Sequence, residues 1–165
     1  MVVLACDPGK DGAIAVLDGR KVLASAFTRD LIGKRDWKEV GPVLAAWIRS
    51  AHAEHRIGVA VLELYAGRAG EGGGSLLTIG VGWGTVYGIL SGLEIPVLTP
   101  TSSSWTREMF KGVAGDGKER SVNLCRSVLP DVDLSPGRKR KPHDGLADAC
   151  CLALWGQTTA LARVT

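Results

Sequence analysis

The sequence predicts one mixed α/β domain, with helices on both faces of its sheet. Three observations lead to this prediction. Short apolar runs bounded by turn residues indicate buried strands, Asp18-Gly19 between two such runs indicates a hairpin, and longer segments with helical spacing alternate with the later strands. A chain of 165 residues is long enough to bury a core without disulfides or structural zinc, so residues 1–165 are expected to form a single domain.

The predicted elements follow one another without an internal repeat. The first three are strands at Val2–Cys6, Ala13–Leu17 and Val22–Phe27, which form an antiparallel meander. The others are a helix at about 36–55 with Asp36 as its N-cap, a strand at Ile57–Leu62, a helix from about Ser75 to Leu90, a strand at Ile95–Leu98, a helix capped by Thr101–Ser104, a helix at Lys118–Leu129, and a last helix at about 143–162.

One segment has the composition of a membrane span. Ser75 to Leu93 carries no charge over about the length of a transmembrane helix. Because it contains several glycines and lies between segments typical of soluble domains, we expect a buried helix of a soluble domain and no membrane contact. Gly80, Gly84 and Gly88 form a small-residue stripe that allows another helix to approach closely, either within the monomer or from a second copy.

The cysteines indicate a reducing compartment. Cys6, Cys125, Cys150 and Cys151 lie in apolar stretches without the spacing of a zinc site, so we expect buried free thiols. No secretion signal is evident, and we expect a cytoplasmic protein of a bacterial or phage-infected cell. The scarcity of Asn and Gln fits a thermophilic source or a GC-rich genome equally well.

Four acidic residues stand at the ends of apolar segments. Asp7 follows the first strand, Glu63 follows the fourth, and Asp144 and Asp148 open the last helix. Carboxylates at the ends of buried elements are costly to desolvate unless something compensates their charge. Because a divalent cation compensates several carboxylates at once, these residues predict a Mg²⁺ site and phosphoryl-transfer chemistry on a nucleic acid.

A basic loop precedes the last two acids. Arg138, Lys139, Arg140 and Lys141 lie just before His143, whereas the net charge of the whole chain is only +3. A basic loop beside an acidic cluster suits a site where metal and phosphate meet, and an ordinary solvated loop would have the same composition.

Short motifs along the chain occur in a defined order. They are Asp7-Pro8-Gly9 followed by Gly12-Ala13-Ile14-Ala15, then Leu62-Glu63, then the region with Trp105, Lys111 and Gly117-Lys118-Glu119-Arg120-Ser121, and last His143-Asp144-Gly145-Leu146-Ala147-Asp148-Ala149. Each motif is weak alone, but the ordered set resembles the RuvC-type Holliday junction resolvases over nearly the whole chain. The resemblance implies a ribonuclease H-like fold with a mixed five-stranded sheet.

The last motif departs from the common bacterial pattern, in which the last two acids lie three residues apart. Here residue 145 is Gly, and Asp144 lies four residues before Asp148. Both spacings place the two side chains on one face of a helix. The variant looks more like the divergent phage or organellar branches, and whether Asp144 or His143 serves the second metal is left open.

The resemblance implies a structure-selective endonuclease that cuts four-way DNA junctions by paired symmetric nicks. Asp7 would bridge two Mg²⁺ ions, with Mn²⁺ as a substitute, while Glu63 would bind one ion and Asp148 the other. Asp144 would assist. His143 would orient the water or act as a general base, or it would only stand at the helix start.

Several residues are candidate DNA contacts. Lys118 would contact the scissile phosphate, as the resemblance implies, or be an ordinary surface lysine. Tyr65 would stack on a base near the branch point, and the glycines around Arg68 would permit close approach to DNA. Lys111 is a weaker candidate, and Arg138–Lys141 would position phosphates without reading sequence.

A homodimer is also implied, because two-fold symmetry would place one active site on each of two opposing junction strands. Recombination or packaging machinery would be further partners. Three alternatives stay open: a ribonuclease H-like nuclease for flaps, forks or RNA–DNA hybrids, a junction-binding protein without catalysis, and an actin- or hexokinase-type nucleotide-binding domain. The last rests on Asp7-Pro8-Gly9 with its hairpin, although that fold usually needs two such domains.

Overall fold

The structure is a computed structural model that describes residues 1–8, 12–33, 37–65, 70, 72–136 and 141–162. Its centre is a five-stranded sheet in the order β3-β2-β1-β4-β5. Strand β1 pairs antiparallel with β2 and parallel with β4, so the predicted mixed sheet is confirmed. The strands are β1 (Val2–Cys6), β2 (Ala13–Asp18), β3 (Lys21–Phe27), β4 (Val59–Leu62) and β5 (Val97–Leu98).

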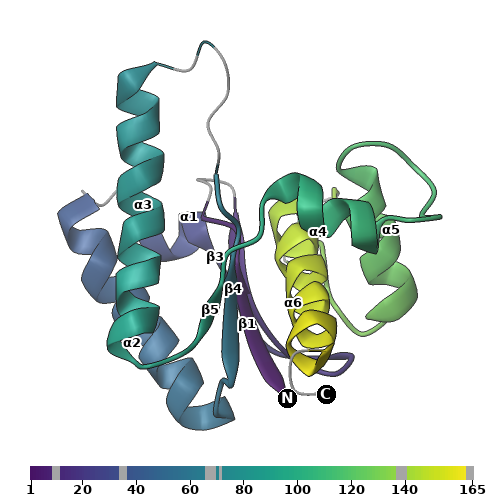
Figure 1. Ribbon diagram of the computed structural model, residues 1–165, viewed down its shortest axis with the longest axis horizontal. Helices are drawn as coiled ribbons and strands as arrows, with labels where there is room; N and C mark the ends of the chain where they lie inside the picture. The colour runs from purple at the N-terminus through teal and green to yellow at the C-terminus, as the bar shows by residue number, and fades with distance from the viewer. Residues whose placement is uncertain (9–11, 34–36, 66–69, 71, 137–140, 163–165) are drawn as a thin grey trace.

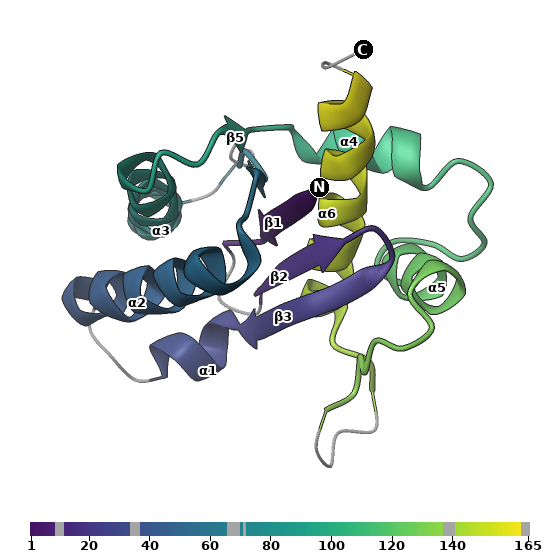
Figure 2. The ribbon, with the colours of Figure 1, turned by 90° about the horizontal axis from the view of Figure 1, so that it is seen from below.

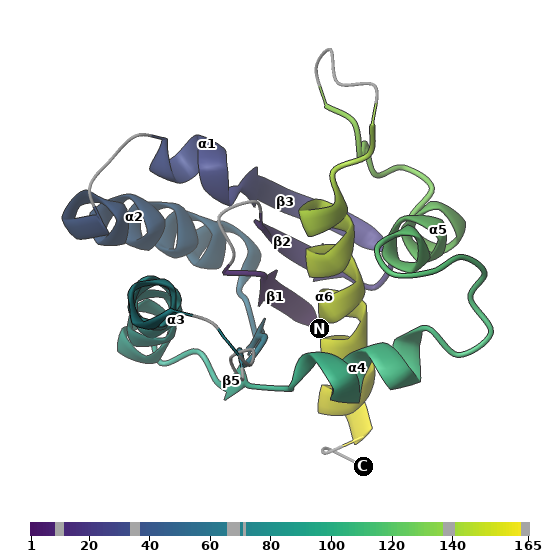
Figure 3. The same ribbon diagram turned by 90° about the horizontal axis from the view of Figure 1, so that it is seen from above.

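Helices cover both faces of the sheet, as predicted. Figures 1, 2 and 3 show α1 (Thr28–Ile32), α2 (Trp37–His55) and α3 (Gly73–Gly92) on one side. The other side carries α4 (Ser102–Met109), α5 (Glu119–Val128) and α6 (Asp144–Ala162).

The central strand β1 is buried on both faces, which explains why its sequence is apolar throughout. Val3 and Ala5 belong to the core cluster under α6, whereas Leu4 and Cys6 belong to the cluster under α2 and α3. Successive side chains of a strand point to opposite faces, so one short apolar run serves two cores.

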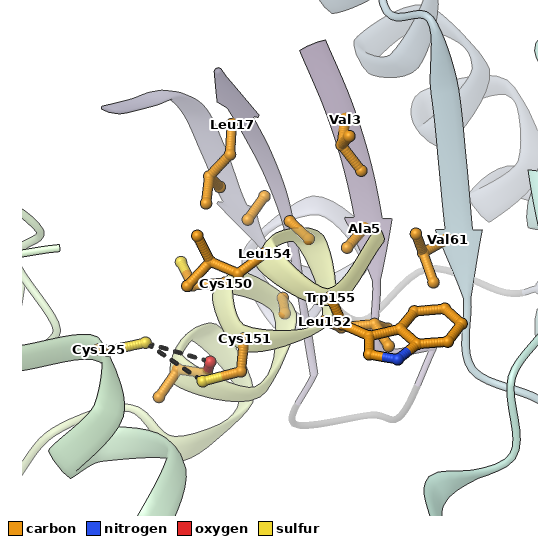
Figure 4. Packing of buried hydrophobic residues seen from close by; sticks show 14 of the residues in the cluster. Val3, Ala5, Leu17, Val61, Cys125, Cys150, Cys151, Leu152, Leu154 and Trp155 are labelled. Atoms are coloured by element: carbon orange, nitrogen blue, oxygen red, sulfur yellow. Dashed lines mark hydrogen bonds between the residues drawn. The ribbon is translucent and has the colours of Figure 1, made fainter. Parts of the chain in front are cut away.

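Helix α6 lies very close to the sheet. A Cβ atom added at Gly156 would stand 2.4 Å from Cγ2 of Val61 and 3.1 Å from Cγ1 of Val3, so only glycine permits this approach. Cys125 of α5 packs against α6, with its Sγ 3.7 Å from Sγ of Cys151 (Figure 4). All four cysteines are buried free thiols, as predicted.

The prediction that the segment from Ser75 to Leu93 is buried was wrong. Only Val86 and Leu90 of α3 are buried, and Leu77 keeps 69% of its surface exposed. By length and composition alone α3 is also apolar enough to cross a membrane, and only 11% of its apolar stretch is buried in this structure. Its uncharged sequence predicts an apolar environment, but composition alone does not show whether that environment lies within the monomer.

Other differences from the predicted elements are small and local. Helix α1 was not predicted, because five residues are too few to show a helical period. Strand β5 begins at Val97 rather than Ile95, because the Ile95 N–H is donated to the Leu90 carbonyl in the turn after α3. The predicted N-cap Asp36 lies outside the described residues.

Candidate metal centre

Parallel pairing of β1 with β4 brings the first two acids together. Cys6 lies opposite Leu62 in the register, so Asp7 and Glu63 leave the sheet as neighbours. Because Cys6 and Leu62 both face the α2 side, the alternation of strand side chains turns the next residues toward α6. The backbone N–H of Asp7 is donated to the Ala13 carbonyl at 3.0 Å, which fixes the strand end.

The start of α6 brings the other two acids to the same place. Figure 1 shows that α6 begins at the end of the sheet where β1 and β4 finish, away from the two termini. Asp144 is the first residue of α6, and Asp148 follows one turn later. The structure thus gathers four acids from three segments at one end of the sheet.

The pKa of Asp148 shows that the four carboxylates share one electrostatic environment. The pKa of Asp148 is raised to about 6, and burial of its side chain is the largest cause. The negative charges of Asp7, Asp144 and Glu63 also contribute to this raised pKa, whereas the nearby Ser121 hydroxyl lowers it. Such mutual repulsion places the four carboxylates within electrostatic range of one another.

Glu63 is half-buried and held by hydrogen bonds. Burial raises its pKa, hydrogen bonds from the Trp105 indole and from Ser102 lower it, and the charge of Asp7 raises it. The Trp105 Nε1–H donates a hydrogen bond to Oε2 of Glu63 at 2.8 Å. The Trp83 Nε1–H donates one to the Glu63 backbone carbonyl at 3.1 Å.

Lys118 lies beside the acids, just before α5. Its ammonium donates a hydrogen bond to Oδ2 of Asp144. This hydrogen bond is the largest cause that raises the pKa of Lys118, and the charges of Asp144, Asp148 and Asp7 raise it as well. Burial would raise the pKa of Asp144, but the hydrogen bond and charge of Lys118 and the Gly145 N–H lower it overall. The exposed Lys118 ammonium therefore neutralises part of the negative charge in the site.

His143 has a structural task at the start of α6. Its Nδ1 accepts the backbone N–H of Leu146 at 3.2 Å, which is the geometry of an N-cap. The imidazole ring packs on the Phe27 ring with centroids 4.3 Å apart. The backbone N–H of His143 donates a hydrogen bond to the Leu134 carbonyl at 2.6 Å. His143 therefore stands at the helix start and caps it, and a catalytic role for His143 stays a prediction.

The donor set of the site suits Mg²⁺, because all four side chains are carboxylates. The raised pKa values of Glu63 and Asp148 mark negative charge that a cation would relieve. Within the part of the chain that the structure describes, however, no three His, Cys, Asp or Glu side chains are close enough to hold one ion. Side-chain rotations that draw the carboxylates together would have to accompany cation binding.

The predicted DNA contacts are only partly visible. Tyr65 is half-buried two residues after Glu63, Lys111 is exposed after α4, and Lys141 is exposed before α6. Four further candidates lie outside the described residues, namely Arg68, Arg138, Lys139 and Arg140. Four residues whose side chains interact with the acids received no role from sequence: Trp83, Ser102, Trp105 and Ser121.

The burial of Asp148 predicts how pH affects the stability of the metal-free protein. Its pKa of about 6 in the folded chain lies above the ordinary 3.8. The folded chain therefore favours the protonated carboxyl. Its contribution to the free energy of unfolding is fully present below the ordinary pKa and is lost as pH rises through about 6. Asp148→Asn cannot ionise, so in EDTA near neutral pH it should be more stable than wild type by on the order of 2 kcal/mol. Urea denaturation at acidic and neutral pH measures this difference.

The same variant should respond less to a divalent cation. Mg²⁺ should raise the melting temperature of wild type more than that of Asp148→Asn, because the amide is a poorer ligand. Asp18→Asn is a suitable control, since Asp18 pairs with Val2 at the other end of the sheet. An Asp148→Asn protein that is less stable than wild type at neutral pH in EDTA would contradict the account.

Comparison with solved structures identifies the fold. RuvC of Thermus thermophilus, in complex with a Holliday junction substrate, has a TM-score of 0.72 at 18% identity, covering 98% of this chain and 96% of that one. A second T. thermophilus RuvC structure gives a TM-score of 0.70 at 19% identity, with coverages of 98% and 96%.

The yeast mitochondrial Holliday junction resolvase Ydc2 is also similar, with a TM-score of 0.63 at 12% identity over 98% of this chain and 80% of that one. Neither a protein-family model nor a curated protein matches the sequence. The chain therefore has the ribonuclease H-like fold of the RuvC-type Holliday junction resolvases, as the order of its motifs predicts.

Proposed function

We propose that this chain is a metal-dependent endonuclease that resolves four-way DNA junctions by paired symmetric nicks. The observation that carries the proposal is the meeting of Asp7, Glu63, Asp144 and Asp148 in one electrostatic environment. The choice of substrate is supported by the fold, because one solved structure of this fold holds a Holliday junction.

The four acids would supply the oxygen ligands of two Mg²⁺ ions. When bound, the ions would activate a water and stabilise the leaving oxygen of the phosphodiester. Asp7, directly after the central strand, would be a ligand of both ions, Glu63 of one and Asp148 of the other.

Basic residues would bind the DNA backbone. The Lys118 side chain is 74% exposed and already pairs with an acid of the site, so it would contact the scissile phosphate. Lys111 and Lys141 are exposed on either side of α5 in the chain and would add sequence-independent phosphate contacts. Tyr65 would stack near the branch point, and Arg68 and Arg138–Arg140 remain proposed contacts.

A second copy of the chain would cover α3. Leu76 and Leu77 are 43% and 69% exposed, which is unusual for adjacent leucines of a soluble domain. A Cβ atom added at Gly80, Gly84 or Gly88 would meet nothing within 4 Å, so the small-residue stripe packs against none of the residues that the structure describes. A two-fold symmetric dimer through this helix would match the approximate symmetry of a four-way junction.

Cleavage of a labelled synthetic junction tests the proposed activity. Wild type with Mg²⁺ should nick opposing strands of the junction and leave a matched linear duplex and a flap intact. Asp7→Asn and Glu63→Gln should lose at least ~10²-fold in rate, because each removes a metal ligand worth several kcal/mol, while junction binding is retained.

Three outcomes would change the assignment. Cleavage retained by Asp7→Asn would remove Asp7 from the mechanism. Equal cutting of flaps or forks would indicate a broader nuclease for branched nucleic acids. Tight junction binding with no cutting in Mg²⁺ or Mn²⁺ would leave a binding protein without catalysis.

Substitution on α3 tests the proposed dimer. Leu77→Glu should convert a dimer into a monomer, because the charge would be buried against the partner copy. The monomer should nick one strand at a time rather than in pairs. Light scattering after gel filtration measures the mass, and Leu161→Glu, at a leucine that is 59% exposed near the end of α6, is the control. A monomeric wild type, or a Leu77→Glu dimer, would contradict this surface.

A further inference from the structure

Glu63 is held from both layers of the fold by tryptophan side chains. Trp83 of α3 donates its indole N–H to the Glu63 backbone carbonyl, and Trp105 of α4 donates to the side-chain oxygen Oε2. The side chain and the backbone of one acid are thus fixed independently.

Trp105 is a rigid donor. It is 2% exposed, belongs to the core cluster under α6, and meets Phe110 edge-to-face with ring centroids 5.4 Å apart. A packed indole cannot follow a moving carboxylate, and its buried N–H needs an acceptor. The 2.8 Å hydrogen bond therefore restricts the rotamer of Glu63.

The start of α4 lies against the same residue. Ser102, the first residue of α4, is near enough to Glu63 to lower its pKa, and Trp105 follows three residues later on the same helix face. The backbone is held as well, because the Leu64 N–H donates a hydrogen bond to the Pro100 carbonyl at 2.8 Å. An ionised carboxylate has about four acceptor sites, so the hydrogen bond from Trp105 leaves capacity for a cation.

We propose that Trp105 is a positioning residue that orients Glu63 toward a divalent cation and so sets the cation affinity of the site. The inference rests on the proposed function, since it takes Glu63 as a cation ligand. Trp105 touches neither cation nor DNA in this account. Its loss should weaken cation binding and leave the chemical step intact once the cation is saturating.

The chain supplies a closely matched control. Trp155 of α6 is 9% exposed, belongs to the same core cluster, and donates its indole N–H to Oε2 of Glu108, also at 2.8 Å. Glu108 is exposed and is not one of the four acids. Trp155→Phe therefore removes the same kind of packing and the same kind of hydrogen bond at a carboxylate outside the site.

The experiment compares Trp105→Phe with Trp155→Phe in the full chain. Titration of Mn²⁺ and Mg²⁺, followed by calorimetry and by melting temperature, gives the cation affinity without any cleavage. Trp105→Phe should bind the cation ~10–100-fold more weakly than wild type, as is typical when the partner of a metal ligand is lost, and Trp155→Phe should bind as wild type does. In cleavage assays, Trp105→Phe should need more Mg²⁺ but approach the wild-type rate at saturation.

Equal cation affinities for Trp105→Phe and Trp155→Phe would overturn the inference, whether both are normal or both are weakened. If Trp105→Phe does not fold, Trp105→Met takes its place, since a flexible Met side chain fills much of the core space and also lacks the indole N–H that donates to Glu63. A Trp105→Met protein with wild-type affinity would then overturn it.

Glu63→Gln separates failure of the inference from failure of the proposed function. If Glu63→Gln binds the cation as tightly as wild type, Glu63 is not a ligand and the proposed metal centre itself is wrong. If Glu63→Gln binds weakly while Trp105→Phe binds normally, the metal centre stands and only the positioning role is wrong.

Discussion

The in-register parallel pairing of β1 with β4 is the constraint on which the rest of this structure depends. It places Cys6 opposite Leu62, so that the next residues, Asp7 and Glu63, must emerge side by side. Helix α6 then lies across the same face, pressed onto the sheet at Gly156, and its first turns carry the other two acids. A one-residue slip of β4 would turn Glu63 to the opposite face and divide the site.

Gathering four carboxylates opposes folding, and the surrounding residues limit this cost only in part. Burial and mutual repulsion raise the pKa values of Glu63 and Asp148, whereas Lys118 lowers that of Asp144. The hydrogen bond from Trp105 holds the Glu63 carboxylate in a fixed orientation. Sites that retain such unfavourable charge are typically those where a cation or substrate relieves it, which is the physical basis of the proposed activity.

The sequence predicted the strands and the acids well, because both signals are local. Val2–Cys6 is apolar throughout since it is buried on both faces, and an acid directly after such a run is conspicuous. The contacts of Trp105 could not be predicted in the same way, because its partner lies 42 residues away and depends on how α4 docks. The exposure of α3 was missed for a related reason: composition shows that a helix avoids water but does not show what covers it.

The central claim is that Asp7, Glu63 and Asp148 hold divalent cations together, with Asp144 assisting. Anomalous diffraction from crystals of the protein grown with Mn²⁺ tests this claim most directly, because the manganese signal locates the ion independently of any assay. The account predicts manganese bound by carboxylate oxygens of Asp7 and of at least one of Glu63 and Asp148. Manganese bound only elsewhere on the protein, or no bound manganese at saturating concentration, would contradict it.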